Sequence, residues 1–221
     1  DGYIDPEGIA EKFSSETLVR MPASYYCYRP NEDSPPVNNL PAIPNGYLTF
    51  GAFNSYAKLT PPTLALWTTI LQVVSGAKLM IMTRELQDPV LRQELLDRFT
   101  LLGISPARLI ISSAPSTEET LKAYHQIDIS LDTFPFCGAT TTCQALWMGV
   151  PVITLVGHTP AARAGLSILS ALGLTEVIAY TSQDYLNIAV RLADEIEYLQ
   201  KLRATMRDRM IASPLMDAVG F

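Results

Sequence analysis

A run of glycine, alanine and threonine that leads into an apolar helix and strand is the part of this chain best suited to bind an anion. It reads GATTTCQALWMGVPVITL over residues 138–155. Gly138 and Ala139 leave room for a ligand to approach the backbone. The three threonines that follow would lie where a helix exposes unpaired N–H groups and the positive end of its dipole. Because helix N-termini of this kind bind phosphate, the run predicts a phosphate-binding turn.

The elements that must position this turn are marked by helix stop and start residues. The helix after the turn is expected to end near Gly149, because glycine terminates helices and Pro151 cannot continue one. Residues 150–155 then predict a buried strand. Upstream, Thr60 and Pro61 predict the N-cap and first residue of another helix. Ser116 and Glu119, which are three residues apart, have the spacing of a capping box.

From Tyr47 onward the pattern alternates between strand and helix. The expected strands cover residues 47–53, 78–83, 109–112, 127–131, 150–155 and 177–180, and the expected helices cover 60–74, 90–102, a short segment after 116, 140–149, 161–172 and 182–211. Strands separated by helices of this length require right-handed crossovers and a parallel sheet covered on both faces. The sequence therefore predicts an α/β, doubly wound, Rossmann-like domain, in which ligands bind at the C-terminal ends of the strands.

The first 46 residues have a different composition. The prolines at positions 30, 35, 36, 41 and 44 predict an extended segment that wraps a surface or links domains. We therefore expect residues 1–46 to form a Pro-rich lead-in segment and residues 47–221 to form the Rossmann-like lobe.

Composition excludes several classes of protein. The 221 residues carry a formal net charge of -6, which argues against a nucleic-acid-binding surface. Cys27, Cys137 and Cys143 are scattered, so they predict neither a disulfide framework nor a zinc site, and a cytoplasmic location fits best. Two uncharged stretches contain proline and polar residues, and neither predicts a membrane span.

Several enzyme classes are excluded by missing motifs. The chain contains no Asp-x-Asp pair for a metal-bound diphosphate, no GxGxxG, no GxxxxGK[ST] and no GxSxG. These exclusions leave the turn at residues 138–142 as the candidate binding site, with phosphate held at a helix N-terminus.

Three segments carry a family resemblance. GAFNSYAKLTP (residues 51–61), ISLDTFPFCGATTTCQALWMGVPVITL (129–155) and SPLMDA (213–218) together resemble the C-terminal lobe of the O-GlcNAc transferase and SPINDLY family. Members are GT-B glycosyltransferases, usually preceded by tetratricopeptide repeats, that transfer a sugar from a nucleotide donor to Ser or Thr of proteins. The resemblance implies that this chain is the C-terminal, nucleotide-binding half, that its donor is UDP-GlcNAc, and that an N-terminal lobe and upstream repeats complete the enzyme.

The resemblance also implies roles for particular residues. Lys58 matches the lysine that stabilises the leaving diphosphate, Thr140 and Thr141 match the threonines that hold the phosphates, and the backbone of the loop after the third strand matches the base-binding segment. The implied donor-binding residues are Asn54, Ser55, Lys58, Ser113, Ala114, Gly138, Ala139, Thr140, Thr141, Thr142 and Gln144.

Two departures from the family pattern keep a second interpretation open. Gln144 replaces the Asp or Glu that binds the ribose in relatives, and the loop at residues 112–120 lacks the Lys and His of animal members. The alternative is a non-catalytic scaffold that binds nucleotide or a protein partner. The part of the gene that encodes the sequence before this chain would discriminate between the enzyme and the scaffold, because the enzyme needs an N-terminal lobe with suitably placed histidines.

The remaining polar residues each have a structural and a functional interpretation. For His125 and His158 we favour the structural one, and neither is our candidate catalytic base. Asp132 could face the ligand or stabilise a turn, and Arg163 could contact phosphate or lie on a helix surface.

Overall fold

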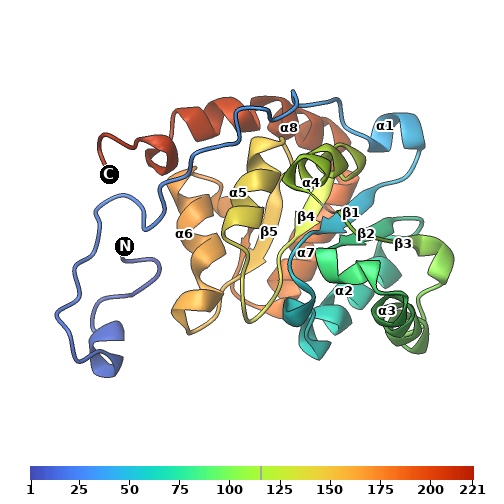
Figure 1. Ribbon diagram of the computed structural model, residues 1–221, viewed down its shortest axis with the longest axis horizontal. Coiled ribbons are helices and arrows are strands. Elements are labelled where there is room, and N and C mark those ends of the chain that lie inside the picture. Colours follow the sequence, from blue (N-terminus) through green and yellow to red (C-terminus); the bar gives the residue numbers. More distant parts are fainter. Residues whose placement is uncertain (115) are drawn as a thin grey trace.

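Six parallel strands form the centre of the computed structural model, which describes residues 1–114 and 116–221 (Figure 1). Their bounds are β1 Thr49–Ala52, β2 Lys78–Met82, β3 Leu109–Ser112, β4 Ile129–Leu131, β5 Val152–Leu155 and β6 Ile178–Ala179. The order is β3-β2-β1-β4-β5-β6, and each neighbouring pair is parallel. The predicted doubly wound sheet is confirmed, and its strand order reverses between β1 and β4.

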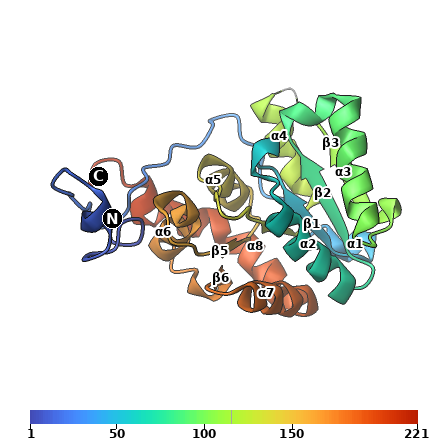
Figure 2. The ribbon, with the colours of Figure 1, turned by 90° about the horizontal axis from the view of Figure 1, so that it is seen from below.

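Helices cover both faces of this sheet. Their bounds are α1 Ala42–Asn45, α2 Pro61–Val73, α3 Pro89–Leu101, α4 Thr117–Ala123, α5 Thr140–Trp147, α6 Ala164–Ala171, α7 Ser182–Asp194 and α8 Ile196–Ile211. Figure 2 shows α5 and α6 on one side of β5 and α7 on the other. Within the described part of the chain, no helix is both long and apolar enough to cross a membrane.

Helix boundaries follow the local signals. Thr60 is the N-cap of α2, where its hydroxyl accepts a hydrogen bond from the Thr63 N–H at 3.4 Å, and Pro61 is the first helical residue. Ser116 accepts from the Glu119 N–H in the same way. The start of α6 was predicted three residues too early, because Pro160–Ala162 form a separate 3-10 turn.

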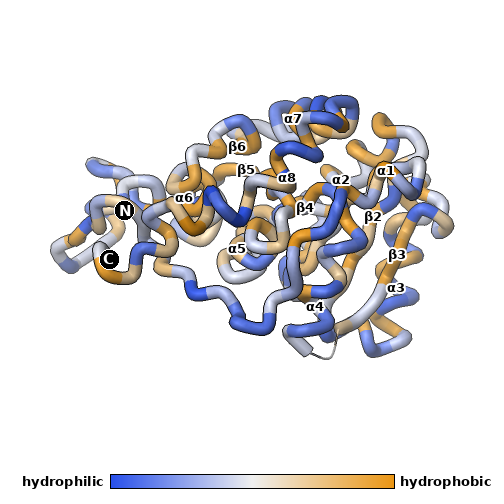
Figure 3. The backbone as a smooth tube through the Cα atoms, turned by 90° about the horizontal axis from the view of Figure 1, so that it is seen from above, coloured by the Kyte–Doolittle hydropathy of each residue, from blue (hydrophilic) through white to orange (hydrophobic). Residues whose placement is uncertain are grey.

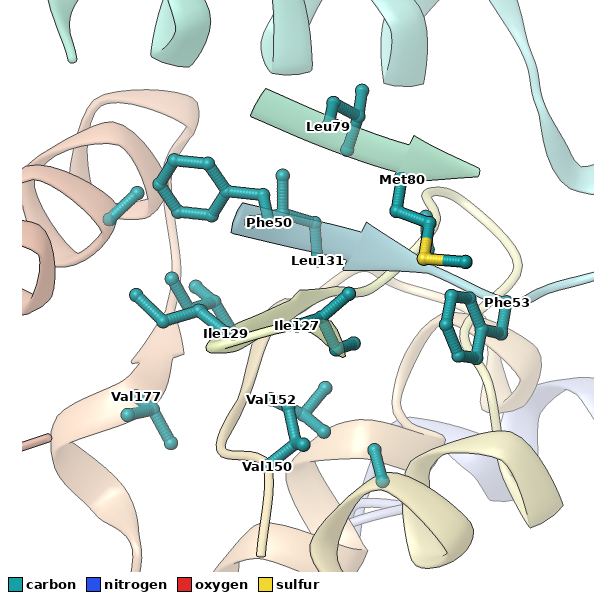
Figure 4. Close-up of a cluster of buried hydrophobic side chains, with 14 of the residues drawn as sticks. Phe50, Phe53, Leu79, Met80, Ile127, Ile129, Leu131, Val150, Val152 and Val177 are labelled. Carbon is teal, nitrogen blue, oxygen red and sulfur yellow. The ribbon is translucent and has the colours of Figure 1, made fainter. Parts of the chain in front are cut away.

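The core lies where the strands meet the helices. Phe50, Leu79, Ile129 and Leu131 are fully buried in the layer shown in Figure 4. Trp67 of α2 is also fully buried. In Figure 3 the hydrophobic colour follows β2 and β3, whereas α4 and much of the lead-in segment are hydrophilic. Burial of apolar strand residues on both faces explains why these strands are continuous apolar runs in the sequence.

The lead-in segment, residues 1–46, is extended over most of its length but includes two short helical pieces. These are a 3-10 turn, Ala10–Phe13, and α1. The sequence did not predict α1, because the Asp128 carboxylate that accepts its first N–H, from Ala42 at 2.8 Å, lies 86 residues away. The two chain ends lie at the same end of the molecule (Figure 1).

One buried arginine attaches the lead-in segment to the sheet. Arg203 of α8 is 1% exposed and donates hydrogen bonds to the carbonyls of Asn38 and Ile127, both at 2.9 Å. Burial lowers the pKa of this guanidinium to about 10, so it stays charged at neutral pH. The lead-in segment therefore wraps the lobe along a hydrogen-bonded path.

Candidate functional site

The start of α5 presents open backbone donors at the carboxyl edge of the sheet. The loop from Thr133 to Gly138 follows β4, and α5 begins after Ala139 with no side-chain cap. The first intrahelical bond runs from the Cys143 N–H to the Ala139 carbonyl. Among the described residues, the N–H groups of the first three helical residues have no acceptor. These donors and the helix dipole suit an anion.

The three threonines at this helix start have different environments. Thr140 is exposed, Thr141 is half-buried and Thr142 is buried. The Thr141 hydroxyl donates to Oδ1 of Asn54 at 2.9 Å. Thr140 and Thr141 are therefore accessible to a ligand through their side chains, whereas Thr142 can offer only its N–H. Gln144 follows on α5 and is half-buried.

The segment after β1 supplies the other side of the crevice. Asn54 is 5% exposed and Ser55 is exposed, and Lys58 ends the 3-10 turn Tyr56–Lys58. The Lys58 ammonium donates to the Cys137 carbonyl at 2.8 Å and lies 3.9 Å from the centre of the Phe136 ring. Burial lowers the pKa of this ammonium below its ordinary value. Lys58 is thus not a solvated surface lysine, since it reaches the loop that leads into α5.

Gly138 is required by close packing in the turn. A Cβ atom at this position would lie 2.5 Å from Oγ1 of Thr141, 2.8 Å from Oγ1 of Thr142 and 3.0 Å from Oδ1 of Asn54. Its N–H donates to the Asp132 carboxylate at 2.7 Å. The turn therefore depends on the absence of a side chain at residue 138.

Asp132 organises this loop, which the sequence left undecided between a ligand contact and a turn residue. It directly follows β4 and is 3% exposed. Besides the Gly138 N–H, its carboxylate accepts hydrogen bonds from the Thr133 N–H at 2.9 Å and the Thr154 hydroxyl at 2.8 Å. Burial raises the pKa of this carboxyl to about 6. The sequence signal for this role was the position of the aspartate between a buried strand and a turn of small residues.

Ser113 and Ala114 lie at the same edge of the sheet but in the loop after a different strand. They follow β3, which is separated from β1 by β2, and both are half-buried. The predicted loop also contains Pro115, which lies outside the described residues. Among the described residues, no hydrogen bond joins Ser113 or Ala114 to the turn before α5.

Among the described residues, neither histidine nor Arg163 forms a hydrogen bond with residues 138–142. His125 Nε2 is 2.9 Å from the Pro36 carbonyl oxygen, which supports the structural interpretation of this residue. His158 is exposed at the rim of a cavity of about 650 Å³ between the lead-in segment and the start of α6. Arg163 donates to the carbonyls of Tyr3 and Gly157.

Comparison with known proteins assigns this arrangement to a family. The model of glycosyl transferase family 41 matches residues 38–221. The chain belongs to glycosyl transferase family 41. The resemblance inferred from three sequence segments is thereby confirmed.

Relatives of family 41 match the whole chain. A probable UDP-N-acetylglucosamine–peptide N-acetylglucosaminyltransferase SPINDLY from Eustoma exaltatum is 39% identical over 222 residues, which cover 100% of this chain and 24% of that protein. A mutant of Thermobaculum terrenum O-GlcNAc transferase superposes with a TM-score of 0.91 at 34% identity, covering 100% of this chain and 41% of that one. The chain thus spans about a quarter of the length of the curated relative.

A more distant structure shows the fold alone. The C-terminal domain of a glycosyl transferase group 1 family protein from Francisella tularensis matches with a TM-score of 0.57 at 14% identity. The match covers 80% of this chain and 93% of that domain. The family 41 chain therefore has the fold of a GT-B C-terminal domain, as predicted.

Proposed function

We propose that this chain is the nucleotide-sugar-binding lobe of a metal-independent, inverting protein O-glycosyltransferase whose donor is UDP-GlcNAc. The observation that carries the proposal is the meeting of the Lys58 ammonium with the loop before α5, at the carboxyl ends of β1 and β4. Ligands of doubly wound folds bind in the crevice where the strand order reverses. The names of the family 41 relatives, which specify UDP-N-acetylglucosamine and a peptide, support this donor.

In this proposal, the first residues of α5 and Lys58 bind the donor diphosphate. The open N–H groups of Thr140, Thr141 and Thr142 face its oxygens. Lys58 keeps its hydrogen bond to the Cys137 carbonyl and donates another to a phosphate oxygen, so its ammonium opposes the charge that grows on the leaving group. An interaction that strengthens as this charge grows lowers the barrier to sugar transfer.

The other proposed contacts orient the nucleoside. Gln144 bonds to the ribose through its amide oxygen, and backbone groups of Ser113 and Ala114 pair with the base edge. Asn54 and Ser55 face the diphosphate from the β1 side, and Gly138 and Ala139 let it approach the backbone. An N-terminal lobe supplies the catalytic base and binds the acceptor Ser or Thr.

Calorimetric titration of the chain with UDP and GDP tests the proposed donor site. We expect UDP to bind, and the substitution Thr141→Val to weaken binding about fivefold, because one hydroxyl is lost while the volume is nearly conserved. Circular dichroism must show that both proteins are folded. Preferential binding of GDP would replace the proposed nucleotide, and binding of neither nucleotide by a folded chain would favour the scaffold interpretation.

A further inference from the structure

Asp132 is a buried carboxylate at the centre of the site. None of the proposed donor contacts uses it. Its two oxygens have separate partners. Oδ1 accepts from the N–H groups of Thr133 and Gly138, and Oδ2 accepts from the hydroxyl of Thr154 on β5. With only 3% of its surface exposed, the residue is covered by the loop that it binds. Asp132 therefore acts on its surroundings and not on a ligand directly.

The hydrogen bonds of Asp132 determine where the Lys58 ammonium lies. Thr133 and Gly138 are the two ends of the loop after β4, and both donate to the same carboxylate oxygen. The peptide group that carries the Gly138 N–H also carries the Cys137 carbonyl. That carbonyl accepts the hydrogen bond from Lys58 at 2.8 Å. One peptide group therefore joins Asp132 to Lys58.

The charges on these groups are complementary. The Lys58 ammonium lowers the pKa of the Asp132 carboxyl, and the Asp132 carboxylate raises the pKa of the ammonium. The other titratable neighbours of Asp132 are Cys137, Tyr185 of α7 and Tyr26 of the lead-in segment. The Tyr185 hydroxyl donates to the backbone carbonyl of Asp132 at 3.0 Å. Burial raises the pKa of all three, that of Tyr26 to about 12, so they are neutral near pH 7.

We propose that Asp132 is a positioning residue for Lys58: its carboxylate holds the loop whose Cys137 carbonyl binds the ammonium, and its negative charge complements that ammonium in a half-buried site. The role in donor binding rests on the proposed function of the lobe. Burial lowers the pKa of Lys58 and the carboxylate opposes that shift, which agrees with the geometry. Without Asp132, Lys58 would lose its proton at a lower pH and bind diphosphate over a narrower pH range.

The link between the two residues can be measured without any nucleotide. The chain has five lysines, at positions 12, 58, 78, 122 and 201, so ¹³Cε-lysine labelling gives few signals, and a Lys58→Met variant assigns the one of interest. In the unsubstituted chain, we expect the Lys58 signal to show an inflection near pH 6, where Asp132 ionises. This measurement needs no Asp132 variant, so it tests the proposal even if such a variant does not fold.

The variant Asp132→Asn removes the charge and keeps the hydrogen bonds. Its amide oxygen can accept from both N–H groups, and its amide nitrogen can donate to the Thr154 hydroxyl oxygen. We expect the Lys58 titration to move to lower pH in this variant. Thr154→Val is the matched control, because it removes one hydrogen bond to Asp132 but keeps the charge, and we expect it to leave the Lys58 titration in place.

Binding of UDP-GlcNAc over the same pH range tests the consequence for the donor. As the pH is raised, the affinity for UDP-GlcNAc should begin to fall at a lower pH in Asp132→Asn than in the unsubstituted chain. Lys58→Met should not show this alkaline decrease. If the chain binds no nucleotide sugar, the function proposed for the lobe fails, yet the lysine titration still decides the role of Asp132. An unchanged Lys58 titration in a folded Asp132→Asn protein, or no inflection near pH 6 in the unsubstituted chain, would overturn the proposal.

Discussion

Replacing Gly138 by alanine should damage the proposed phosphate-binding turn more than the fold. The added methyl group would lie 2.5 Å from the Thr141 hydroxyl oxygen and 3.0 Å from Oδ1 of Asn54, which are themselves hydrogen-bonded to each other at 2.9 Å. The contact with Thr141 is shorter than carbon and oxygen atoms tolerate, and the contact with Asn54 is tight. The threonine must rotate or the turn must shift, and either change breaks the Thr141–Asn54 hydrogen bond.

The magnitude follows from these contacts. Overpacking costs about 1–3 kcal/mol, and the lost hydrogen bond costs about 1 kcal/mol. Because the obstructing atoms are the ends of side chains and not backbone, we expect a value near the lower limit, about 2 kcal/mol of unfolding free energy. Displacement of the Thr141 hydroxyl and the first N–H groups of α5 should weaken UDP binding about tenfold, which corresponds to 1.4 kcal/mol.

Gly51→Ala is the matched control for this experiment. A methyl group on Gly51 of β1 would meet the side chain of Ile127, with Cγ2 at 2.8 Å, in the buried core and not in the turn. We expect this variant to lose about 3 kcal/mol of unfolding free energy but to bind UDP normally when folded. Urea denaturation and calorimetry measure the two quantities separately. If Gly138→Ala bound UDP as tightly as the unsubstituted chain, the turn before α5 would not be the phosphate site.

Three further predictions address the leaving group, the lead-in segment and pH. Lys58→Ala in a full-length protein should lower the rate of sugar transfer about 10²-fold or more, and normal turnover would refute its role at the diphosphate. Arg203→Met should lower the free energy of unfolding, measured by urea denaturation, by about 3 kcal/mol, because the buried carbonyls of Asn38 and Ile127 lose their donor. A decrease below about 1 kcal/mol would contradict this. Because the pKa of Asp132 is raised from 3.8 to about 6 in the folded chain, its contribution to stability is present below pH 3.8 and is lost as the pH rises through 6. This loss should lower the free energy of unfolding by about 3 kcal/mol. In Asp132→Asn, the free energy of unfolding measured by urea denaturation should therefore depend less on pH between pH 4 and 7.

The sequence by itself determined the succession of elements and the position of the turn. The Thr60–Pro61 and Ser116–Glu119 pairs mark helix starts. In the structure, each N-cap hydroxyl accepts a hydrogen bond from the backbone N–H three residues further along the chain. Apolar runs of four to eight residues mark the strands in the same way. These features are predictable because capping and hydrophobic periodicity involve only residues that are near neighbours along the chain.

Only the tertiary structure decided which residues meet at the turn. Thr141 and Asn54 are 87 residues apart, and Lys58 and Cys137 are 79 apart, and each pair meets because β4 lies beside β1. The burial of Thr142 and the three hydrogen bonds of Asp132 likewise depend on how α5 and β5 pack around the loop. Strand order depends on how the apolar surfaces of the whole chain are buried together, and no local pattern encodes it. The residues of the turn could therefore be predicted from the sequence, whereas the carboxylate that holds them in place required the folded chain.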